Sequence, residues 1–234
     1  MNPAAEPMLF CWSGGKDSAM ALTAIRKRGD CRVTALLTTV TEGYDRISMH
    51  GVRRELLEWQ AEAIGLPLRK VLIPPDCVNA TYEARMREAL EEQHAKGVRR
   101  VVFGDIFLED LRVYREKNLA LIGMTGVFPL WKQDTRELAR RFVEEGFRAV
   151  VVCVDSRVLP RGFAGRELDD SFFADLPPGV DPCGENGEFH TFVFDGPVFR
   201  TPLSVARGEV VERGPFIYCD LMPVRAEKTS GCVS

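Results

Sequence analysis

The stretch Met8-Leu9-Phe10-Cys11-Trp12-Ser13-Gly14-Gly15-Lys16-Asp17-Ser18 decides the fold of this chain. Its first five residues form an apolar run that predicts a buried strand, and residues 19–28 have the pattern of a helix. A glycine-rich turn between a strand and a helix presents N–H groups and the positive end of the helix dipole to one point. The stretch therefore predicts an α/β fold with a phosphate site at the turn.

The residues of the turn supply different parts of this site. Its two glycines let the backbone bend tightly and approach an anion, its serines add hydroxyl donors and its lysine adds a cation. An ordinary strand-to-helix turn would explain the glycines, but not all six positions and both flanks. The Walker pattern, Gly-x-x-x-x-Gly-Lys followed by Ser or Thr, does not occur. The predicted phosphate site comprises Ser13, Gly14, Gly15, Lys16, Asp17 and Ser18.

The composition bounds the class of protein. Lysine and arginine number 31 and aspartate and glutamate 34, which gives 234 residues a net charge of −3. This balance disfavours nucleic acid as a partner, because nucleic-acid-binding domains carry basic faces. The seven cysteines form no Cys-x-x-Cys pair, and the sequence has neither a signal-peptide pattern nor 18 consecutive apolar residues. We expect a cytoplasmic protein without a membrane partner; a homodimer is an expectation that the sequence does not test.

Strand and helix patterns alternate along the first two thirds of the chain. They predict a doubly wound parallel sheet over residues 1–155, which includes the apolar strand 149–155. Glycine, proline and aspartate then cluster, and short strand-like runs follow, so we expect a smaller α+β domain over 156–228 and a frayed tail over 229–234. The predicted strands cover 8–12, 33–40, 69–73, 100–104, 149–155, 189–194, 203–211 and 216–221, and the predicted helices cover 19–28, 52–64, 79–96, 108–121 and 135–145.

Loops that follow the strands should carry the nucleotide contacts, because ligands of open parallel sheets bind beyond the carboxyl ends of the strands. His50 lies in one such loop and could face ATP or substrate, and a loop histidine without a role is an equal alternative. Gly104 would permit close approach to a nucleotide. Asp105 could hold Mg²⁺ or a ribose hydroxyl, and Asp17 is a second candidate ligand of Mg²⁺ carried by ATP.

Two arginines follow in the predicted helix 108–121. Arg112 and Arg115 lie three residues apart and so share one helix face. They could clamp a carboxylate or a phosphate of the substrate. A solvated, charged helix surface is the alternative.

A second polar motif, Cys183-Gly184-Glu185-Asn186-Gly187-Glu188-Phe189-His190-Thr191-Phe192-Val193, leads from a turn into a strand. The start of a hairpin would explain its glycines, but not its acids and its histidine. We expect this turn to lie where the second domain folds back over the first. The candidate substrate-binding residues of the motif are Glu185, Asn186, Gly187, Glu188 and Thr191.

These motifs together resemble a known enzyme family. The hexapeptide resembles the pyrophosphate loop, Ser-Gly-Gly-x-Asp-Ser, of the N-type ATP pyrophosphatases. With the Val-Phe-Gly-Asp-Ile strand end, the Arg-x-x-Arg-Glu helix and the Gly-Glu-Asn-Gly-Glu-Phe-His-Thr turn, nearly the whole chain resembles the diphthine–ammonia ligase family. The resemblance implies that ATP, with Mg²⁺, adenylates a substrate carboxylate and that ammonia then displaces AMP. Residues 13–18 would hold pyrophosphate, Gly104 and Asp105 would border ATP, and 185–191 would line the acceptor pocket.

The placement of these loops also indicates catalytic roles. Lys16 would stabilise the departing pyrophosphate, and Asp17 would be needed for the ATP step. Glu188 or His190 would accept a proton from the incoming amine or orient it, because ammonium must lose a proton before it attacks. The acceptor would be protein-borne diphthine or a small carboxylate metabolite. The family more often has Gly-Glu-Gly-Gly-Glu, an aromatic residue and Glu-Thr in this turn, so Asn186 and His190 leave room for a different acceptor.

Two other functions are compatible with the sequence. A tRNA thiolase would share the ATP chemistry, with Cys183 as the suggestive thiol, although a single loop cysteine is more often structural. A non-catalytic sensor could bind ATP or AMP on the same scaffold, because a fold does not determine a function. The acidic turn favours an acceptor and hence an enzyme.

Overall fold

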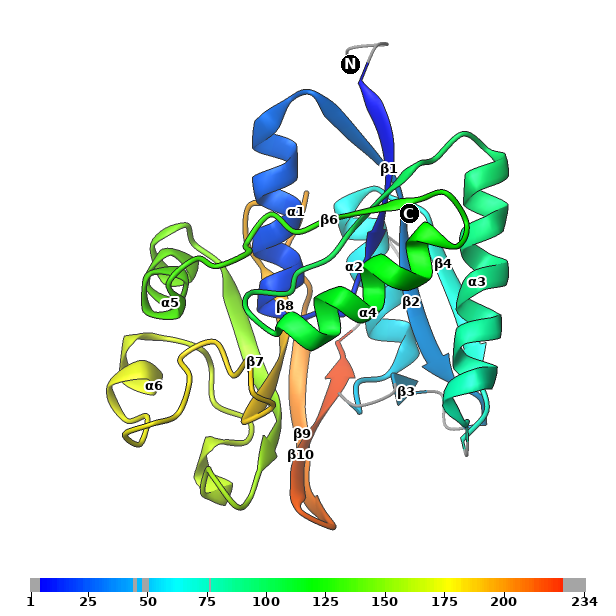
Figure 1. Ribbon diagram of the computed structural model, residues 1–234. Helices are drawn as coiled ribbons and strands as arrows, with labels where there is room; N and C mark the ends of the chain where they lie inside the picture. Colours follow the sequence, from blue (N-terminus) through cyan, green and yellow to red (C-terminus); the bar gives the residue numbers. More distant parts are fainter. Residues whose placement is uncertain (1–4, 44–45, 48–50, 76, 225–234) are drawn as a thin grey trace, which may run out of the picture.

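The computed structural model describes residues 5–43, 46–47, 51–75 and 77–224 of the chain. Two sheets organise it (Figure 1). The first is parallel apart from one short strand, and the second is antiparallel and is formed by the C-terminal part of the chain.

The parallel sheet has the strand order β4-β2-β1-β5-β6. The chain runs from β1 outward through β2 to β4 and then returns to the other side of β1, so the order reverses between β1 and β5. The two-residue strand β3 pairs antiparallel with the end of β2. The strands of this sheet are β1 Glu6–Cys11, β2 Cys31–Thr41, β3 Arg46–Ile47, β4 Leu68–Ile73, β5 Arg100–Val102 and β6 Thr125–Val127.

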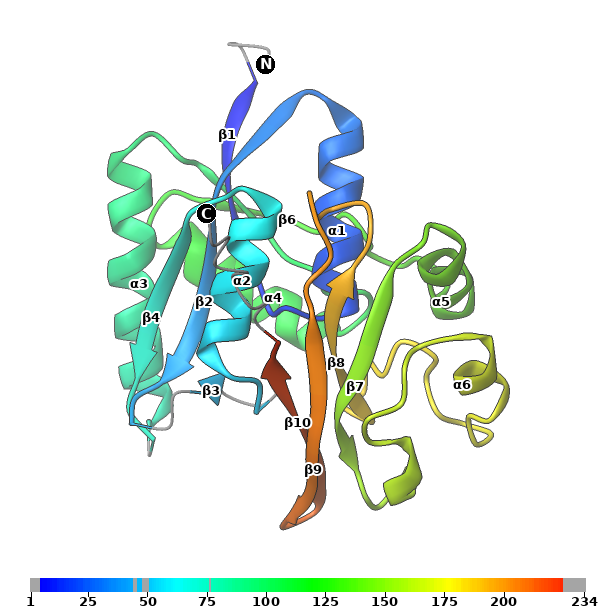
Figure 2. The ribbon, with the colours of Figure 1, turned by 180° about the vertical axis from the view of Figure 1, so that it is seen from behind.

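Helices cover both faces of this sheet (Figures 1 and 2). Side chains alternate between the two faces along each strand, so neighbouring residues of a strand pack against helices on opposite sides. Phe10 joins a buried cluster with apolar residues of α1 and α2, whereas its neighbour Leu9 joins a separate cluster with α3 and α4. The predicted doubly wound α/β fold is confirmed. The helices beside the sheet are α1 Lys16–Arg28, α2 Arg54–Ile64, α3 Asn79–Ala95 and α4 Glu109–Ala120.

The antiparallel sheet has the order β8-β7-β10-β9. The prediction that strand 149–155 belongs to the parallel sheet is wrong: β7 pairs antiparallel with β8 and β10. Both of its faces are buried from Ala149 to Val154, and this part is apolar throughout, which is also the signature of a central parallel strand. The elements of this part are α5 Thr135–Glu144, β7 Arg148–Asp155, the 3₁₀ helix η1 Arg161–Phe163, α6 Asp170–Ala174, β8 Phe189–Asp195, β9 Val205–Arg213 and β10 Phe216–Pro223.

The two sheets share one core. The cluster under α1 and α2 continues through α5 and α6 into β7 and β8, where Phe142, Phe172 and Phe192 are almost fully buried. The amide of Val193 in β8 donates to the carbonyl of Gly14, so the second sheet is bonded directly to the glycine-rich turn. The chain passes from the first sheet to the second between β6 and β7, before residue 156. The domain boundary expected near that residue stays a prediction. Residues 229–234 lie outside the described ranges.

Strands β3 and β6 and helix α6 were not anticipated, since two to five residues carry too little periodicity to be seen in a sequence. Within the described ranges, no helix combines the length and the apolar character needed to cross a membrane.

Candidate active site

A cavity of about 380 Å³ opens at the carboxyl ends of β1, β2 and β5. It lies where the strand order reverses, between β1 and β5, which is the place where open α/β sheets bind ligands. Its volume is in the range of small-molecule sites, roughly 300–1,000 Å³. The cavity is lined by Cys11, Trp12, Ser13, Asp17, Ser18, Leu37, Thr38, Thr39, Tyr82, Met86, Phe103, Gly104, Asp105, Arg115 and Glu185.

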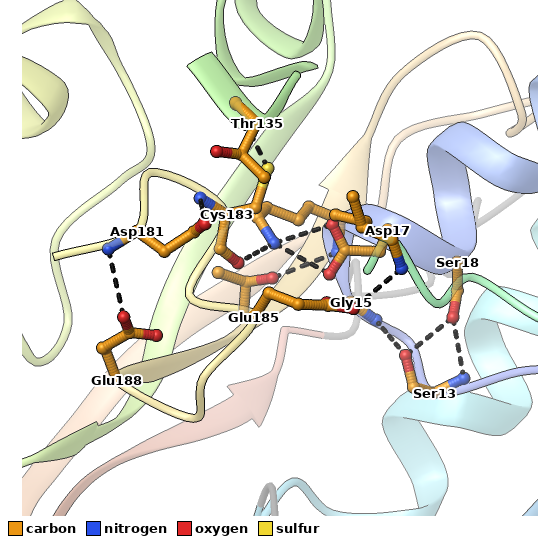
Figure 3. Close-up of polar contacts among 12 residues, drawn as sticks. Ser13, Gly15, Asp17, Ser18, Thr135, Asp181, Cys183, Glu185 and Glu188 are labelled. Atoms are coloured by element: carbon orange, nitrogen blue, oxygen red, sulfur yellow. Dashed lines mark hydrogen bonds and ion pairs between the residues drawn. The ribbon is translucent and has the colours of Figure 1, made fainter. Parts of the chain in front are cut away.

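The glycine-rich turn forms one wall of the cavity, and Figure 3 shows polar contacts of its residues. Gly14 has a φ of +82°, a left-handed conformation that favours glycine. The hydroxyls of Ser13 and Ser18 are 2.7 Å apart, and the amide of Gly15 donates to Ser13 Oγ at 3.3 Å. Hydroxyls, an amide and the first turn of α1 are therefore gathered at one point, as the sequence predicted.

Lys16 points away from this wall. Its side chain is 3% exposed and is not part of the cavity lining. The ammonium donates to both carboxylate oxygens of Asp17 at 2.8 Å and to the carbonyl of Cys183 in the second motif. Burial alone would lower the pKa of Lys16, but the negative charge of Asp17 outweighs it and holds the pKa above its ordinary value. Lys16 is thus a buried cation that joins α1 to the turn after residue 182.

The loop after β5 forms the opposite wall. A Cβ atom on Gly104 would lie 3.0 Å from the backbone carbon of Asp17 and 3.1 Å from the amide of Ser18, so the missing side chain lets this loop touch the start of α1. Asp105 pairs with Arg115 at 2.7 Å, and the Arg115 guanidinium lies 4.4 Å from the ring centroid of Phe103. Both partners of this pair line the cavity.

The second motif brings Glu185 into the cavity. Its Oε1 accepts hydrogen bonds from the amide of Ile106 at 2.7 Å and from that of Phe107 at 3.3 Å, which fixes the carboxyl group against the loop after β5. Burial raises the pKa of Glu185 to about 7, with a smaller contribution from the charge of Asp17, while the two amides act in the opposite direction. A carboxyl group that titrates near neutral pH and faces a cavity is suited to proton transfer.

The other residues of this turn hold its shape. Glu188 is 6% exposed, and its carboxylate accepts from the amides of Asp181 and Asn186, both at 3.0 Å. The Asn186 side chain donates to the same carboxylate, and Gly187 supplies a φ of +87°. Glu188 therefore organises the turn from inside and is not part of the cavity lining.

Thr191 and His190 lie on β8 beside α1. Thr191 Oγ1 accepts the amide hydrogen of Lys16 at 3.1 Å, so this predicted substrate ligand contacts the helix start instead of the cavity. Burial, and secondarily the charge of Lys16, lowers the pKa of His190 to about 4, which makes the imidazole neutral at pH 7.

The two arginines of α4 are separated by the structure. Arg115 reaches the cavity, whereas Arg112 pairs with Glu116 and packs 4.9 Å from the Phe128 ring and 4.6 Å from the Trp131 ring. His50 lies outside the described residues, so its predicted role stays a prediction.

The residues of the cavity that the sequence did not suggest come from segments without a functional motif. Thr38 and Thr39 reach it because β2 extends beyond the last residue of β1, which pairs with Leu37. Tyr82 and Met86 of α3 form the apolar side. The threonine pair at the end of an apolar strand was the available signal, whereas the residues of α3 carry none that distinguishes them from core positions.

The cavity fits Mg²⁺ carried by a nucleotide. Within the described ranges, no three His, Cys, Asp or Glu side chains are grouped so as to hold a metal by themselves. Asp17 and Asp105 line the cavity from opposite walls, where their carboxylates pair with Lys16 and Arg115. Oxygen is the ligand that Mg²⁺ prefers, usually with substrate phosphates completing its shell.

The thiols are poorly suited to sulfur transfer. Cys183 is buried and its Sγ lies 3.4 Å from the carbonyl oxygen of Thr135, and burial raises the pKa of the thiol. Cys11 lines the cavity, but burial raises its pKa to about 12. Because the thiolate is the reactive form, these positions favour packing over catalysis.

The glycine-rich turn lies at the switch point of a doubly wound sheet, and the turn before β8, here called the second-sheet turn, borders the same cavity. This arrangement places the protein in the class of α/β nucleotide-binding enzymes. The chain belongs to the diphthamide synthase family: the model of the diphthamide synthase N-terminal domain matches residues 8–125, and that of the C-terminal domain matches 134–222. Its relatives in this family are ligases.

Curated relatives carry the name diphthine–ammonia ligase. The protein from Danio rerio is 26% identical over 223 residues, which cover 85% of this chain and 86% of that protein. The Homo sapiens protein is 25% identical over 225 residues, which cover 85% and 82%. The Schizosaccharomyces pombe protein is 26% identical over 239 residues, which cover 94% of this chain, but the match spans 38% of that longer protein.

Proposed function

We propose that this chain is an AMP-forming ligase that activates a substrate carboxylate with ATP and converts it to an amide with ammonia. One observation carries the proposal: the phosphate turn and the second-sheet turn border the same cavity, with Ser13 and Ser18 on one side and Glu185 on the other. A nucleotide bound at the first turn would therefore have its α-phosphate within reach of an acceptor at the second.

The first step would be attack of a carboxylate oxygen on the α-phosphorus of ATP, with release of pyrophosphate and formation of an acyl-adenylate. The hydroxyls of Ser13 and Ser18, the amide of Gly15 and the start of α1 are placed to stabilise the charge on the phosphates. Mg²⁺, held by Asp17 and Asp105, would supply further charge neutralisation.

In the second step, the nitrogen lone pair of ammonia would form the C–N bond, the acyl–phosphate C–O bond would break and AMP would leave with its electron pair. Ammonia arises from ammonium by loss of a proton, and the attacking nitrogen loses another. We propose Glu185 as the acceptor of one of these protons, because its carboxyl group faces the cavity whereas that of Glu188 is engaged by backbone amides inside the turn. The roles predicted for Lys16 at pyrophosphate and for His190 remain proposals beside this one.

The acceptor is proposed to be a carboxylate of the diphthine type, as the relatives' name indicates for them. His190 bears on this choice, because a neutral imidazole stands where the family pattern more often has glutamate. The charge beside the second turn therefore differs by about one unit from that pattern, so a small carboxylate metabolite less cationic than diphthine is the alternative acceptor.

The test is a reaction with ATP, Mg²⁺ and ¹⁵N-ammonium, with either a diphthine-containing protein or the small-molecule fraction of a cell extract as acceptor. We expect AMP, pyrophosphate and a ¹⁵N-labelled amide in equal amounts, and none of them with Asp17→Ala. AMP and pyrophosphate without labelled amide would contradict amide formation. Nucleotide binding without AMP under any of these conditions would favour a sensor of ATP or AMP.

A further inference from the structure

Gln60 is an amide side chain in an apolar environment. It lies on α2, where Leu57 and Ala61 are buried on the same side of the helix, and its own exposed fraction is 0%. A buried amide is costly unless its hydrogen-bonding groups find partners. The reason for a glutamine at this position therefore lies in what its amide contacts.

The amide of Gln60 joins α2 to two segments that are far apart in the sequence, the turn before α1 and β8. Its Nε2 donates to the carbonyl of Gly14 at 3.0 Å and to the carbonyl of Val193 in β8 at 2.7 Å. Its Oε1 accepts from Trp12 Nε1 at 2.8 Å. Both donor hydrogens and the acceptor are used.

These contacts fix the orientation of one peptide group. The described residues include no cis peptide bond, and in a trans peptide the C=O and the following N–H point in opposite directions. The carbonyl of Gly14 points toward Gln60 and the amide of Val193. The amide of Gly15 must therefore point the other way, and it does so toward Ser13 Oγ at the cavity wall.

We infer that Gln60 is a positioning residue of the ATP site, which turns the Gly14–Gly15 peptide so that its N–H faces the nucleotide phosphates and holds β8 at a fixed distance from the phosphate turn. This inference rests on the proposed function. A Cβ on Gly14 would lie 2.9 Å from Gln60 Oε1 and 2.7 Å from Leu57 Cδ2, so the turn is seated directly on α2.

The first test is Gln60→Met, which keeps the length and the apolar stem of the side chain but removes the two donors. We expect the Kd for Mg·ATP, measured by calorimetry without acceptor, to rise by about 10-fold or more, which is the scale for loss of an outer supporting contact. Gln93→Met on α3 is the matched control, because Gln93 is also buried and lies on the other side of the sheet. An unchanged Kd in Gln60→Met would overturn the inference.

A second variant separates positioning from packing. Gln60→Glu preserves shape, and a neutral carboxyl group can donate one hydrogen bond whereas a carboxylate can donate none and repels both carbonyls. We expect the ratio of its Kd to that of the unmodified protein to fall as pH is lowered from 8 to 6, because burial keeps the pKa of such a group high. A Kd equal to that of the unmodified protein at both pH values would overturn the inference even if Gln60→Met folds poorly. Failure of the unmodified protein to bind Mg·ATP would instead contradict the proposed function.

Discussion

At the scale of single residues, two acids of one turn have different tasks. Glu185 faces the cavity and accepts amide hydrogens from the loop after β5, while Glu188 closes the turn from inside. Three residues of spacing in a glycine-bearing turn do not reveal which carboxylate points outward. Sequence patterns therefore located the acidic turn but not the carboxyl group that reaches the cavity.

Glu185→Gln should separate the two steps of the reaction. We expect kcat for ammonia-dependent amide formation to fall by about 10²–10⁴-fold, the usual contribution of a positioned base, while carboxylate-dependent pyrophosphate exchange persists. In the unmodified protein, kcat should fall as pH drops below about 7, because Glu185 must be ionised to accept a proton. Loss of exchange together with amide formation would contradict this role.

The same carboxyl group should lower stability at neutral pH. Its pKa is raised on folding, from an ordinary value of 4.5 to about 7, so the folded state is disfavoured once the group must ionise. The destabilisation is absent below pH 4.5 and complete above pH 7. We expect Glu185→Gln to raise Tm more at pH 8 than at pH 4, measured by calorimetry; an equal shift at both values would contradict the pKa.

Gly104 tests the contact between the two cavity walls. In Gly104→Ala the new Cβ would press on the backbone of Asp17 and Ser18, which cannot yield as a flexible side chain does. We expect a rise of about 10-fold or more in the Kd for Mg·ATP, with a loss of about 1–3 kcal/mol in the free energy of unfolding. Gly162→Ala is the control, because a Cβ there meets nothing within 4 Å, and an equal effect of both changes would contradict the contact.

At the scale of elements, β7 shows where sequence patterns are insufficient. Residues 149–155 were predicted as a buried strand, and they are one, but the hydrophobic pattern does not tell which sheet contains it. The alternation of β1, β2, β4 and β5 with their helices was predictable because each has its own period and end signal. Pairings such as Val193 with Gly14 join positions about 180 residues apart, which no local pattern encodes.

The second sheet is also fastened to the segment before α2. Asp220 of β10 pairs with Arg53 at 2.5 Å and with Arg46 at 2.9 Å. Burial would raise the pKa of Asp220, but the two guanidinium groups outweigh this and lower it. This contribution to stability is present above pH 3.8 and is lost as pH falls through the lowered pKa.

Asp220→Asn should therefore lower the free energy of unfolding at pH 7 by about 1–3 kcal/mol, because it removes charge-assisted hydrogen bonds. The difference from the unmodified protein should shrink toward pH 3, as urea titrations at the two pH values would show. Asp30→Asn is the control: its pair with Arg28 is exposed on both sides and should contribute little. A pH-independent difference for Asp220→Asn would contradict the ionic contribution.

At the scale of the whole molecule, two sheets with one core bring the turn before β8 and the turn before α1 to the same cavity. The Thr191 hydroxyl and the Gln60 amide join α1 or its preceding turn to β8, and the buried Lys16 joins α1 to the turn before β8. The proposed nucleotide and acceptor sites are therefore connected by direct hydrogen bonds. Their relative position was beyond sequence reasoning, because it depends on packing between the two halves of the chain.

The most direct test of carboxylate activation in this cavity is pyrophosphate–ATP exchange in the absence of ammonia. We predict exchange that requires both Mg²⁺ and the carboxylate acceptor and that disappears in Asp17→Ala, because an acyl-adenylate forms reversibly only when both substrates occupy the cavity. Exchange that persists in Asp17→Ala, or that proceeds without any carboxylate, would contradict the assignment of this cavity as the site of carboxylate activation.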